Sequence, residues 1–250
     1  MKTIMITGAT SGIGKACAER FAQEGHRLIL CGRREAKLNE LKQKLSTKAQ
    51  IHTLCFDVRK NQDVQKAVKS LPELFRDIDV LINNAGNAHG LDPLTEGHTE
   101  DWDAMMDGNV KGLLYVSKAV LPGMKTKQNG HIVNISSVAA RQTYAGGVVY
   151  CASKRAVDVI SEGMRIELTS FGIKVANIQP GAVATEFSEV RFKGDKERAA
   201  SVYAGYEALK AEDIADAIAY CIHAPAHVTI SDMTIYPAAQ SEPRTIHRKA

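Results

Sequence analysis

Short apolar segments alternate with helical segments along the whole chain, and this alternation restricts the possible folds more than any other feature. The apolar segments typical of strands cover residues 3–7, 27–31, 51–56, 80–83, 131–136, 174–179 and 228–235. The segments with helical spacing cover residues 14–24, 35–45, 63–71, 100–121, 153–171 and 212–223. Strands that are apolar on both faces and separated by helices form a parallel sheet covered on both sides. We therefore expect an α/β, doubly wound, Rossmann-type fold with a seven-stranded parallel sheet flanked by helices.

The domain organisation follows from the same regularity. No Pro-, Gly- or Ser-rich linker interrupts the alternation, so we expect one domain over residues 1–250. Residues 186–210 break the pattern, because many charges and few bulky apolar residues lie there between a strand and the last helix. We interpret this segment as a substrate lid. A solvated pair of surface helices explains its composition equally well.

Composition and charge argue against several classes of partner. The net charge of +4 is small for 250 residues and the basic residues are mostly dispersed, which does not favour nucleic-acid binding. No apolar run reaches the roughly 18 residues of a membrane span, and Met1 leads into a strand pattern rather than a signal peptide. The five cysteines lack CxxC pairs and metal-ligand spacing, so we expect reduced packing residues and no metal. We expect a cytoplasmic protein with no nucleic-acid or membrane partner.

A glycine-rich loop lies between the first expected strand and the first expected helix. A helix N-terminus offers unpaired N–H groups and a partial positive charge, and glycine lets a pyrophosphate approach the backbone closely. The spacing Gly-x-x-x-Gly-x-Gly differs from the shorter dinucleotide fingerprint, and a lone glycine loop can also be only a tight turn. Its position after a strand and before a helix favours nucleotide binding. The residues concerned are Gly8, Thr10, Ser11, Gly12, Ile13 and Gly14.

Cations follow the second expected strand, where an NAD-selective site would place an acid about 20 residues beyond the last glycine. The sequence here offers Arg33 and Arg34. An acid would bind the ribose 2′-hydroxyl, whereas a guanidinium pairs with a 2′-phosphate. We therefore expect NADP rather than NAD, with Arg33 as the main contact. The alternative is that both arginines only begin a solvated helix.

Tyr150 and Lys154 lie four residues apart in a helical segment and so share one helix face. A nearby ammonium stabilises a tyrosinate and would lower the phenol pKa from about 10 towards neutral pH. Ser137 ends the preceding strand and would reach the same crevice, where its hydroxyl could polarise a carbonyl. No Gly-x-Ser-x-Gly elbow surrounds Ser137 and no His/Asp pair is evident, so serine hydrolysis is not favoured.

These motifs together resemble the short-chain dehydrogenase/reductase family. The order and spacing of the matching positions extend over nearly the whole chain. The positions are the loop at residues 7–14, the Asn-Asn-Ala-Gly at 83–86, Asn109, Ser137, Tyr150, Lys154 and the Pro-Gly-Ala-Val-Ala-Thr at 180–185.

The resemblance implies roles for individual residues. Tyr150 would exchange a proton with the substrate oxygen, Ser137 would donate a hydrogen bond to that oxygen, and Lys154 would bind the nicotinamide ribose. Asn109 would support a water-linked proton relay, and because an Asn beside Gly108 and Gly112 lowers helix propensity, we expect a local helix distortion there. The other cofactor contacts implied by the resemblance are Asp57 and Val58 at adenine, Asn83 and Gly86 at the adenosine ribose, Val183 and Thr185 at the carboxamide, and Ala85, Pro180 and Gly181 elsewhere on the cofactor.

Residues 185–187, 190–195 and 225–228 resemble the NADP-dependent 3-hydroxy acid dehydrogenase branch of this family. That resemblance implies oxidation of serine, allo-threonine or short 3-hydroxy acids and reduction of small semialdehydes, with sulfoacetaldehyde and isethionate as an alternative. It also implies a homotetramer. A small anionic substrate needs a cation in the crevice, for which Arg191 is the first candidate and Arg141 the second.

Two other functions fit the same fold. A non-catalytic NADP-binding sensor is possible because fold alone does not establish chemistry, although the intact Ser137, Tyr150 and Lys154 argue against it. A broad carbonyl reductase acting on apolar ketones or steroids would need an apolar lid. The charged residues 191–198 weigh modestly against that reading.

Overall fold

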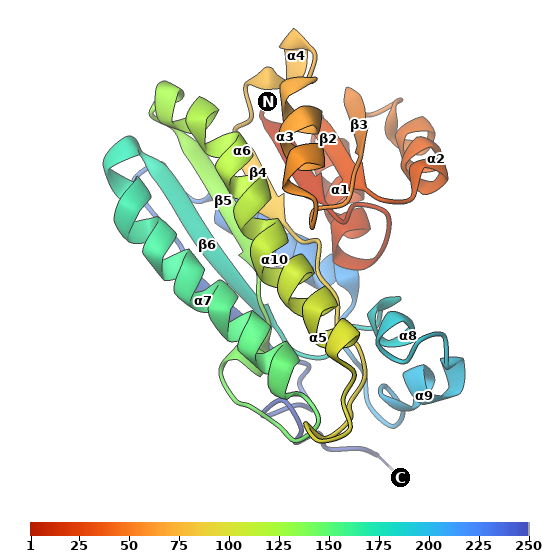
Figure 1. The fold of residues 1–250 in the computed structure, drawn as a ribbon. Coiled ribbons are helices and arrows are strands. Elements are labelled where there is room, and N and C mark those ends of the chain that lie inside the picture. Colours follow the sequence, from red (N-terminus) through yellow and green to blue (C-terminus); the bar gives the residue numbers. More distant parts are fainter. Residues whose placement is uncertain (250) are drawn as a thin grey trace.

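The computed structural model describes residues 1–249, and its centre is one seven-stranded parallel sheet (Figure 1). The strands are β1 (Thr3–Thr7), β2 (Arg27–Gly32), β3 (Ile51–Cys55), β4 (Val80–Asn83), β5 (Gly130–Ile135), β6 (Ile173–Pro180) and β7 (Asp232–Ile235). Their order is β3-β2-β1-β4-β5-β6-β7, and every neighbouring pair is parallel. The order reverses between β1 and β4, which opens a crevice at the carboxyl ends of the strands. The expected fold class is confirmed.

Helices cover both faces of the sheet and create two apolar cores. One face carries α1 (Gly12–Gln23), α2 (Glu35–Leu45) and α10 (Ala211–His223); the other carries α3 (Asn61–Lys69), α6 (Gly112–Lys127) and α7 (Val148–Leu168). Successive side chains of β1 point to opposite faces of the sheet, so Ile4 and Ile6 pack in the first core and Met5 packs in the second. A single turn, α4 (Glu73–Arg76), was not predicted.

The helix predicted over residues 100–121 consists of three parts. These are α5 (Thr99–Met106), a π-helical turn η1 (Asp107–Lys111) and α6. The predicted end at 121 is wrong, because α6 continues through Pro122. Val120 and Met124 on either side of the proline are buried in the core, and this packing offsets the hydrogen bond that proline cannot donate.

Most other predicted boundaries differ by one to three residues, and two differ by more. Helix α7 begins at Val148 rather than 153, which places Tyr150 in its first turn. The last strand begins at Asp232 rather than 228, because the Lys174 ammonium donates to the Pro225 and Val228 carbonyl groups and holds that segment as a loop.

The expected lid segment contains two short helices, α8 (Phe187–Arg191) and α9 (Lys196–Ser201), which lie beyond the carboxyl ends of the strands (Figure 1). A parallel bridge between Val183 and Leu209 joins the two ends of this segment. Among residues 1–249, no helix has both the length and the apolar character that crossing a membrane requires.

Candidate active site

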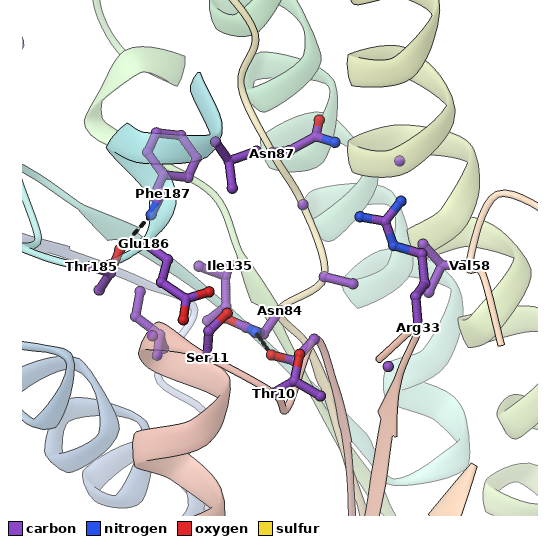
Figure 2. Close-up of a pocket in the computed structure, with 18 of the residues that line it drawn as sticks. Thr10, Ser11, Arg33, Val58, Asn84, Asn87, Ile135, Thr185, Glu186 and Phe187 are labelled. Carbon is purple, nitrogen blue, oxygen red and sulfur yellow. Dashed lines mark hydrogen bonds between the residues drawn. The ribbon is translucent and has the colours of Figure 1, made fainter. Parts of the chain in front are cut away.

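A single cleft at the carboxyl ends of the strands contains most of the predicted site residues (Figure 2). The predicted residues that line it are Gly8, Thr10, Ser11, Gly12, Ile13, Arg33, Arg34, Asp57, Val58, Ala85, Gly86, Ser137, Tyr150, Lys154, Pro180, Gly181, Val183 and Thr185. The crevice at the reversal of strand order therefore joins the glycine loop to the Ser137, Tyr150 and Lys154 group.

The glycine loop places the N-terminus of α1 at the cleft. Ser11 precedes the helix, but no side chain among the described residues caps its first N–H groups. Gly8 and Gly12 have φ of 65° and 50°, a left-handed conformation that side chains disfavour. A Cβ at Gly8 would also lie 2.8 Å from Asn84 Nδ2. The loop thus needs glycine and exposes backbone donors suited to phosphate.

Arg33 and Arg34 have different surroundings, although both line the cleft. The Arg33 side chain is 61% exposed, and Asp57 approaches it only at 3.9 Å. Arg34 donates from Nη1 to Glu186 at 2.8 Å and from Nη2 to Thr10 and Ser11, also at 2.8 Å. Arg33 therefore remains available for a phosphate, whereas Arg34 connects the lid segment to the glycine loop.

Two residues that we expected at the cofactor do not line the cleft. Gly14 lies beneath the loop, where a Cβ would come 2.3 Å from the Gly8 carbonyl oxygen, so its function is close packing of helix against strand. Asn83 is buried and donates from Nδ2 to Ser117 Oγ and Asn134 Oδ1, both at 2.9 Å. As the last residue of β4, Asn83 points into the layer between sheet and helix rather than into the crevice.

Asn109 lies in the π-helical turn, so the expected local distortion is present. Its side chain accepts from the Asn87 N–H at 2.8 Å and donates to the Asn87 carbonyl at 2.9 Å and to Ser153 Oγ at 3.0 Å. A Cβ at Gly86 would lie 2.9 Å from Asn109 Oδ1 and 3.4 Å from Lys154 Nζ. Asn109 itself does not line the cleft but fixes the loop that does.

Ser137, Tyr150 and Lys154 meet where β5 ends against α7. Ser137 follows the strand in extended conformation, and its Oγ accepts from the Ala139 N–H at 3.1 Å. Lys154 is buried and donates from Nζ to the Ile135 carbonyl at 2.9 Å. Tyr150 packs against Phe187 of α8, with ring centroids 5.8 Å apart. The three side chains thus converge on the interior end of the cleft.

Burial dominates the protonation of this group. It raises the pKa of Tyr150; Tyr144 raises it further, and the hydrogen bond with Ser137 and the charge of Arg191 lower it. Burial lowers the pKa of Lys154 to about 8, and the Asp158 charge opposes that shift. The expected lowering of the Tyr150 pKa by Lys154 is therefore not met in this structure, because removing both groups from water favours their neutral forms.

The two arginines proposed for the substrate lie outside the cleft lining. Arg141 donates from Nη1 to Gln179 Oε1 at 2.9 Å and to Thr234 Oγ1 at 3.0 Å, which directs it towards β6 and β7. Arg191 lies at the margin of the cleft, with its guanidinium carbon 5.5 Å from the centre of the Tyr150 ring. The structure thus separates the two candidates by position, and of the two only Arg191 adjoins Tyr150.

Several residues of the cleft were missed by sequence reasoning. Asn84 follows the end of β4 and donates to the Thr7 and Gly8 carbonyl groups at 2.9 and 3.2 Å. Its position just after the strand was the available signal. Glu186, Phe187 and Val190 lie in segments whose resemblance to the branch was noted, but none of them was predicted as a site residue. The other lining residues that were not predicted are Cys31, Gly32, Phe56, Arg59, Asn87, Gly108, Ile135 and Ser136.

Comparison with known proteins shows similarity over almost the full chain. The chain is 45% identical over 239 residues to the NADP-dependent 3-hydroxy acid dehydrogenase YdfG of Salmonella typhi, covering 95% of this chain and 96% of the relative. It is 42% identical to the sulfoacetaldehyde reductase 2 of Chromohalobacter salexigens, covering 95% of each chain. It is 41% identical to the serine 3-dehydrogenase of Agrobacterium fabrum, covering 96% and 95%.

A solved structure supports the same relationship. The closed form of a serine dehydrogenase complexed with NADP⁺ has a TM-score of 0.93 and 42% identity, covering 99% of this chain and 100% of that chain. Residues 2–196 match the family described as short chain dehydrogenase. The chain therefore belongs to the short chain dehydrogenase family of oxidoreductases.

Proposed function

We propose that this chain is an NADP(H)-dependent oxidoreductase that interconverts the CH–OH group of a small anionic hydroxy acid and the corresponding carbonyl. One observation carries the proposal: the same cleft joins the uncapped N-terminus of α1 and the solvent-facing Arg33 to Ser137, Tyr150 and Lys154. The relatives named as NADP-dependent 3-hydroxy acid dehydrogenase and serine 3-dehydrogenase support the reaction and the substrate class.

The residues present fit a phosphorylated dinucleotide. The first N–H groups of α1 and the side-chain-free Gly8 and Gly12 suit the pyrophosphate, and Arg33 suits the 2′-phosphate. Asp57 and Val58 would border adenine, while Pro180, Gly181, Val183 and Thr185 would border the nicotinamide. When bound, this cofactor accepts or supplies the hydride.

The remaining chemistry is proton transfer by the chain's own residues. During oxidation Tyr150 takes the proton of the substrate hydroxyl, and during reduction it returns a proton to the carbonyl oxygen. Ser137 donates a hydrogen bond to the same oxygen and holds it at the tyrosine. Lys154 in its ammonium form favours the tyrosinate, and Asn109 keeps the neighbouring loop in place beside a water relay.

Arg191 is our proposed anchor for the substrate's acidic group. Its Nε donates to the Gly90 carbonyl at 3.0 Å and its Nη1 to Tyr144 Oη at 3.2 Å, which fixes the guanidinium. Its Nη2 is buried and has no hydrogen-bond partner among residues 1–249. A buried unpaired donor beside Tyr150 suits a carboxylate. It equally suits a sulfonate, which the sulfoacetaldehyde reductase relative favours as a second candidate.

Two further features belong to this proposal. Residues 186–210 would act as a lid, since Glu186, Phe187 and Val190 line the cleft. A homotetramer would cover apolar side chains that α6 and α7 expose, namely Leu114, Val159 and Ile166 at 40%, 59% and 76% exposure. The five free cysteines suit the reducing cytoplasm.

A turnover screen tests the proposal. Wild-type protein with NADP⁺ should oxidise at least one of L-serine, allo-threonine, 3-hydroxybutyrate, 3-hydroxypropionate and isethionate. Replacement Tyr150→Phe removes the proton donor and should lower kcat about 1,000-fold, while the Kd for NADPH measured by fluorescence stays unchanged. Cofactor binding without turnover in either protein would indicate a sensor instead.

A further inference from the structure

Asp158 on α7 presents a carboxylate that the proposed reaction does not use. Its Oδ1 accepts from Ser136 Oγ at 2.6 Å and from Asn177 Nδ2 at 2.9 Å, and its Oδ2 accepts from Gln179 Nε2 at 2.9 Å. All three donors are uncharged and buried. Hydrogen bonds from neutral donors stabilise the ionised carboxylate without neutralising it, so its negative charge acts on nearby groups.

Lys154 of the proposed site lies one helical turn before Asp158 on α7. Residues four apart lie on the same helix face, so the Asp158 carboxylate and the Lys154 side chain are neighbours. Both side chains also contact the end of β5. Lys154 Nζ donates to the Ile135 carbonyl. The next residue, Ser136, has its Oγ 2.6 Å from Asp158 Oδ1 and 3.1 Å from the Lys154 carbonyl oxygen. Asp158 and Lys154 are thus connected through two successive residues.

Charge at position 158 matters because Lys154 is buried. Burial lowers the pKa of Lys154 to about 8, and Asp158 is the group that raises it. The lid contributes Arg191, which together with Tyr144 acts on Tyr150. On the sheet side, Asp232 shares Asn177 with Asp158 but is paired with Arg165 at 3.1 Å.

Arg141 is a further charged group near Asp158. It follows η2 (Val138–Ala140), and its guanidinium donates to Gln179 Oε1. Gln179 thus lies between the Arg141 guanidinium and the Asp158 carboxylate. Among residues 1–249, Asp158 is the group that opposes the desolvation of Lys154, so without its carboxylate the pKa of Lys154 should fall further and the ammonium form should be less populated at neutral pH.

We propose that Asp158 is a positioning residue that keeps the buried Lys154 in its ammonium form, so that Lys154 can act on Tyr150 during the reaction. The inference rests on the proposed function for its catalytic consequence. The protonation of Lys154 itself is a property of the chain without cofactor or substrate and can be measured separately.

The first experiment titrates ¹³C-lysine-labelled protein by NMR without cofactor. The Lys154 ¹³Cε resonance is identified by its loss in Lys154→Met. In Asp158→Asn its titration should move about one pH unit lower than in the wild type, because a nearby opposite charge shifts a pKa by about one to three units. Asp158→Glu should restore most of the shift, and Asp232→Asn should leave the titration unchanged. An unchanged titration in Asp158→Asn overturns the proposal.

The second experiment measures kcat/KM for carbonyl reduction against pH. Activity requires the ammonium, so the alkaline limb of the profile should move to lower pH in Asp158→Asn by the amount seen in the NMR titration. A limb that stays in place despite the NMR shift overturns the catalytic part of the proposal. If the Asn variant does not fold, Asp158→Ser replaces it, because serine places no amide donor against Gln179 Nε2.

The two proposals can fail independently. An NMR shift together with a wild-type chain that turns over none of the screened substrates supports the action of Asp158 on Lys154 and overturns the proposed function. Turnover by the wild type with an unchanged Lys154 titration in Asp158→Asn supports the proposed function and overturns the role of Asp158.

Discussion

The two ends of the cleft use arginine in different ways. At the end beside the glycine loop, where we propose that the adenosine binds, the Arg33 side chain is 61% exposed and lies 3.9 Å from Asp57. At the end beside Tyr150, where we propose that the substrate binds, Arg191 is fixed by Gly90 and Tyr144. Its buried Nη2 has no hydrogen-bond partner within residues 1–249. The same functional group is thus solvated at one end and fixed and partly desolvated at the other.

This difference predicts which end of the cleft discriminates more strongly between ligands. A charge in water is screened and loses side-chain entropy when it binds, so its contribution is small. A charge already held out of water needs a partner, and leaving it unpaired is costly. We therefore expect the substrate end to discriminate more strongly than the adenosine end, and three substitutions test this comparison in order of decreasing effect.

The largest effect should follow from Arg191→Leu. Loss of a partly buried, preorganised guanidinium should lower kcat/KM for anionic substrates about 100-fold, while Arg191→Lys should retain part of the activity because it keeps the charge without the fork geometry. Reduction of an uncharged aldehyde of similar size serves as the control and should change little. An equal loss on charged and uncharged substrates would contradict an anion-binding role.

A smaller effect is expected from Arg33→Ala. Because the side chain is exposed, the preference for NADPH over NADH should fall about tenfold, measured as the ratio of kcat/KM values, and the fall should shrink in high salt. Arg34→Ala is the matched comparison, since its guanidinium is already bound to Glu186, Thr10 and Ser11. An unchanged preference in Arg33→Ala would remove Arg33 from the 2′-phosphate site.

The smallest effect is expected from Glu186→Gln. Glu186 pairs with Arg34 at 2.8 Å and with Lys37 at 3.1 Å, and these side chains are 42–46% exposed. Removing its negative charge from a cleft that receives a polyanion should tighten NADPH binding about two- to threefold, as expected for exposed pairs. Fluorescence titration measures the Kd, with Glu189→Gln on the same short helix as control. Weaker binding would show that the ion pair instead holds the lid over the cofactor.

The parts of the site that the sequence predicted are those whose residues lie close together along the chain. The glycine loop, Arg33 and the Tyr150 and Lys154 pair all depend on local spacing, and strand or helix periodicity then places each motif at the carboxyl end of a strand. The π-helical turn at Asn109 was predictable for the same reason, since glycine on either side weakens the helix locally.

Other parts depend on which side chains meet across the sheet. Asn83 and Asn84 are adjacent and chemically identical, yet Asn83 binds Asn134 inside the layer while Asn84 lines the cleft, because successive residues at a strand end point in opposite directions. Arg141 follows Ser137 closely in sequence but is drawn away by Gln179 and Thr234. No local pattern contains these partners.

The sequence by itself therefore determined the doubly wound fold and brought the glycine loop and the proposed catalytic group to one edge of the sheet, because alternation and short spacings are encoded in neighbouring residues. Only the tertiary structure decided that Arg191 rather than Arg141 adjoins Tyr150, that Gly14 serves packing, and that Asp158 faces Ser136 beside Lys154. Those outcomes depend on burial and on hydrogen-bond partners from distant strands and helices, which only the folded chain brings together.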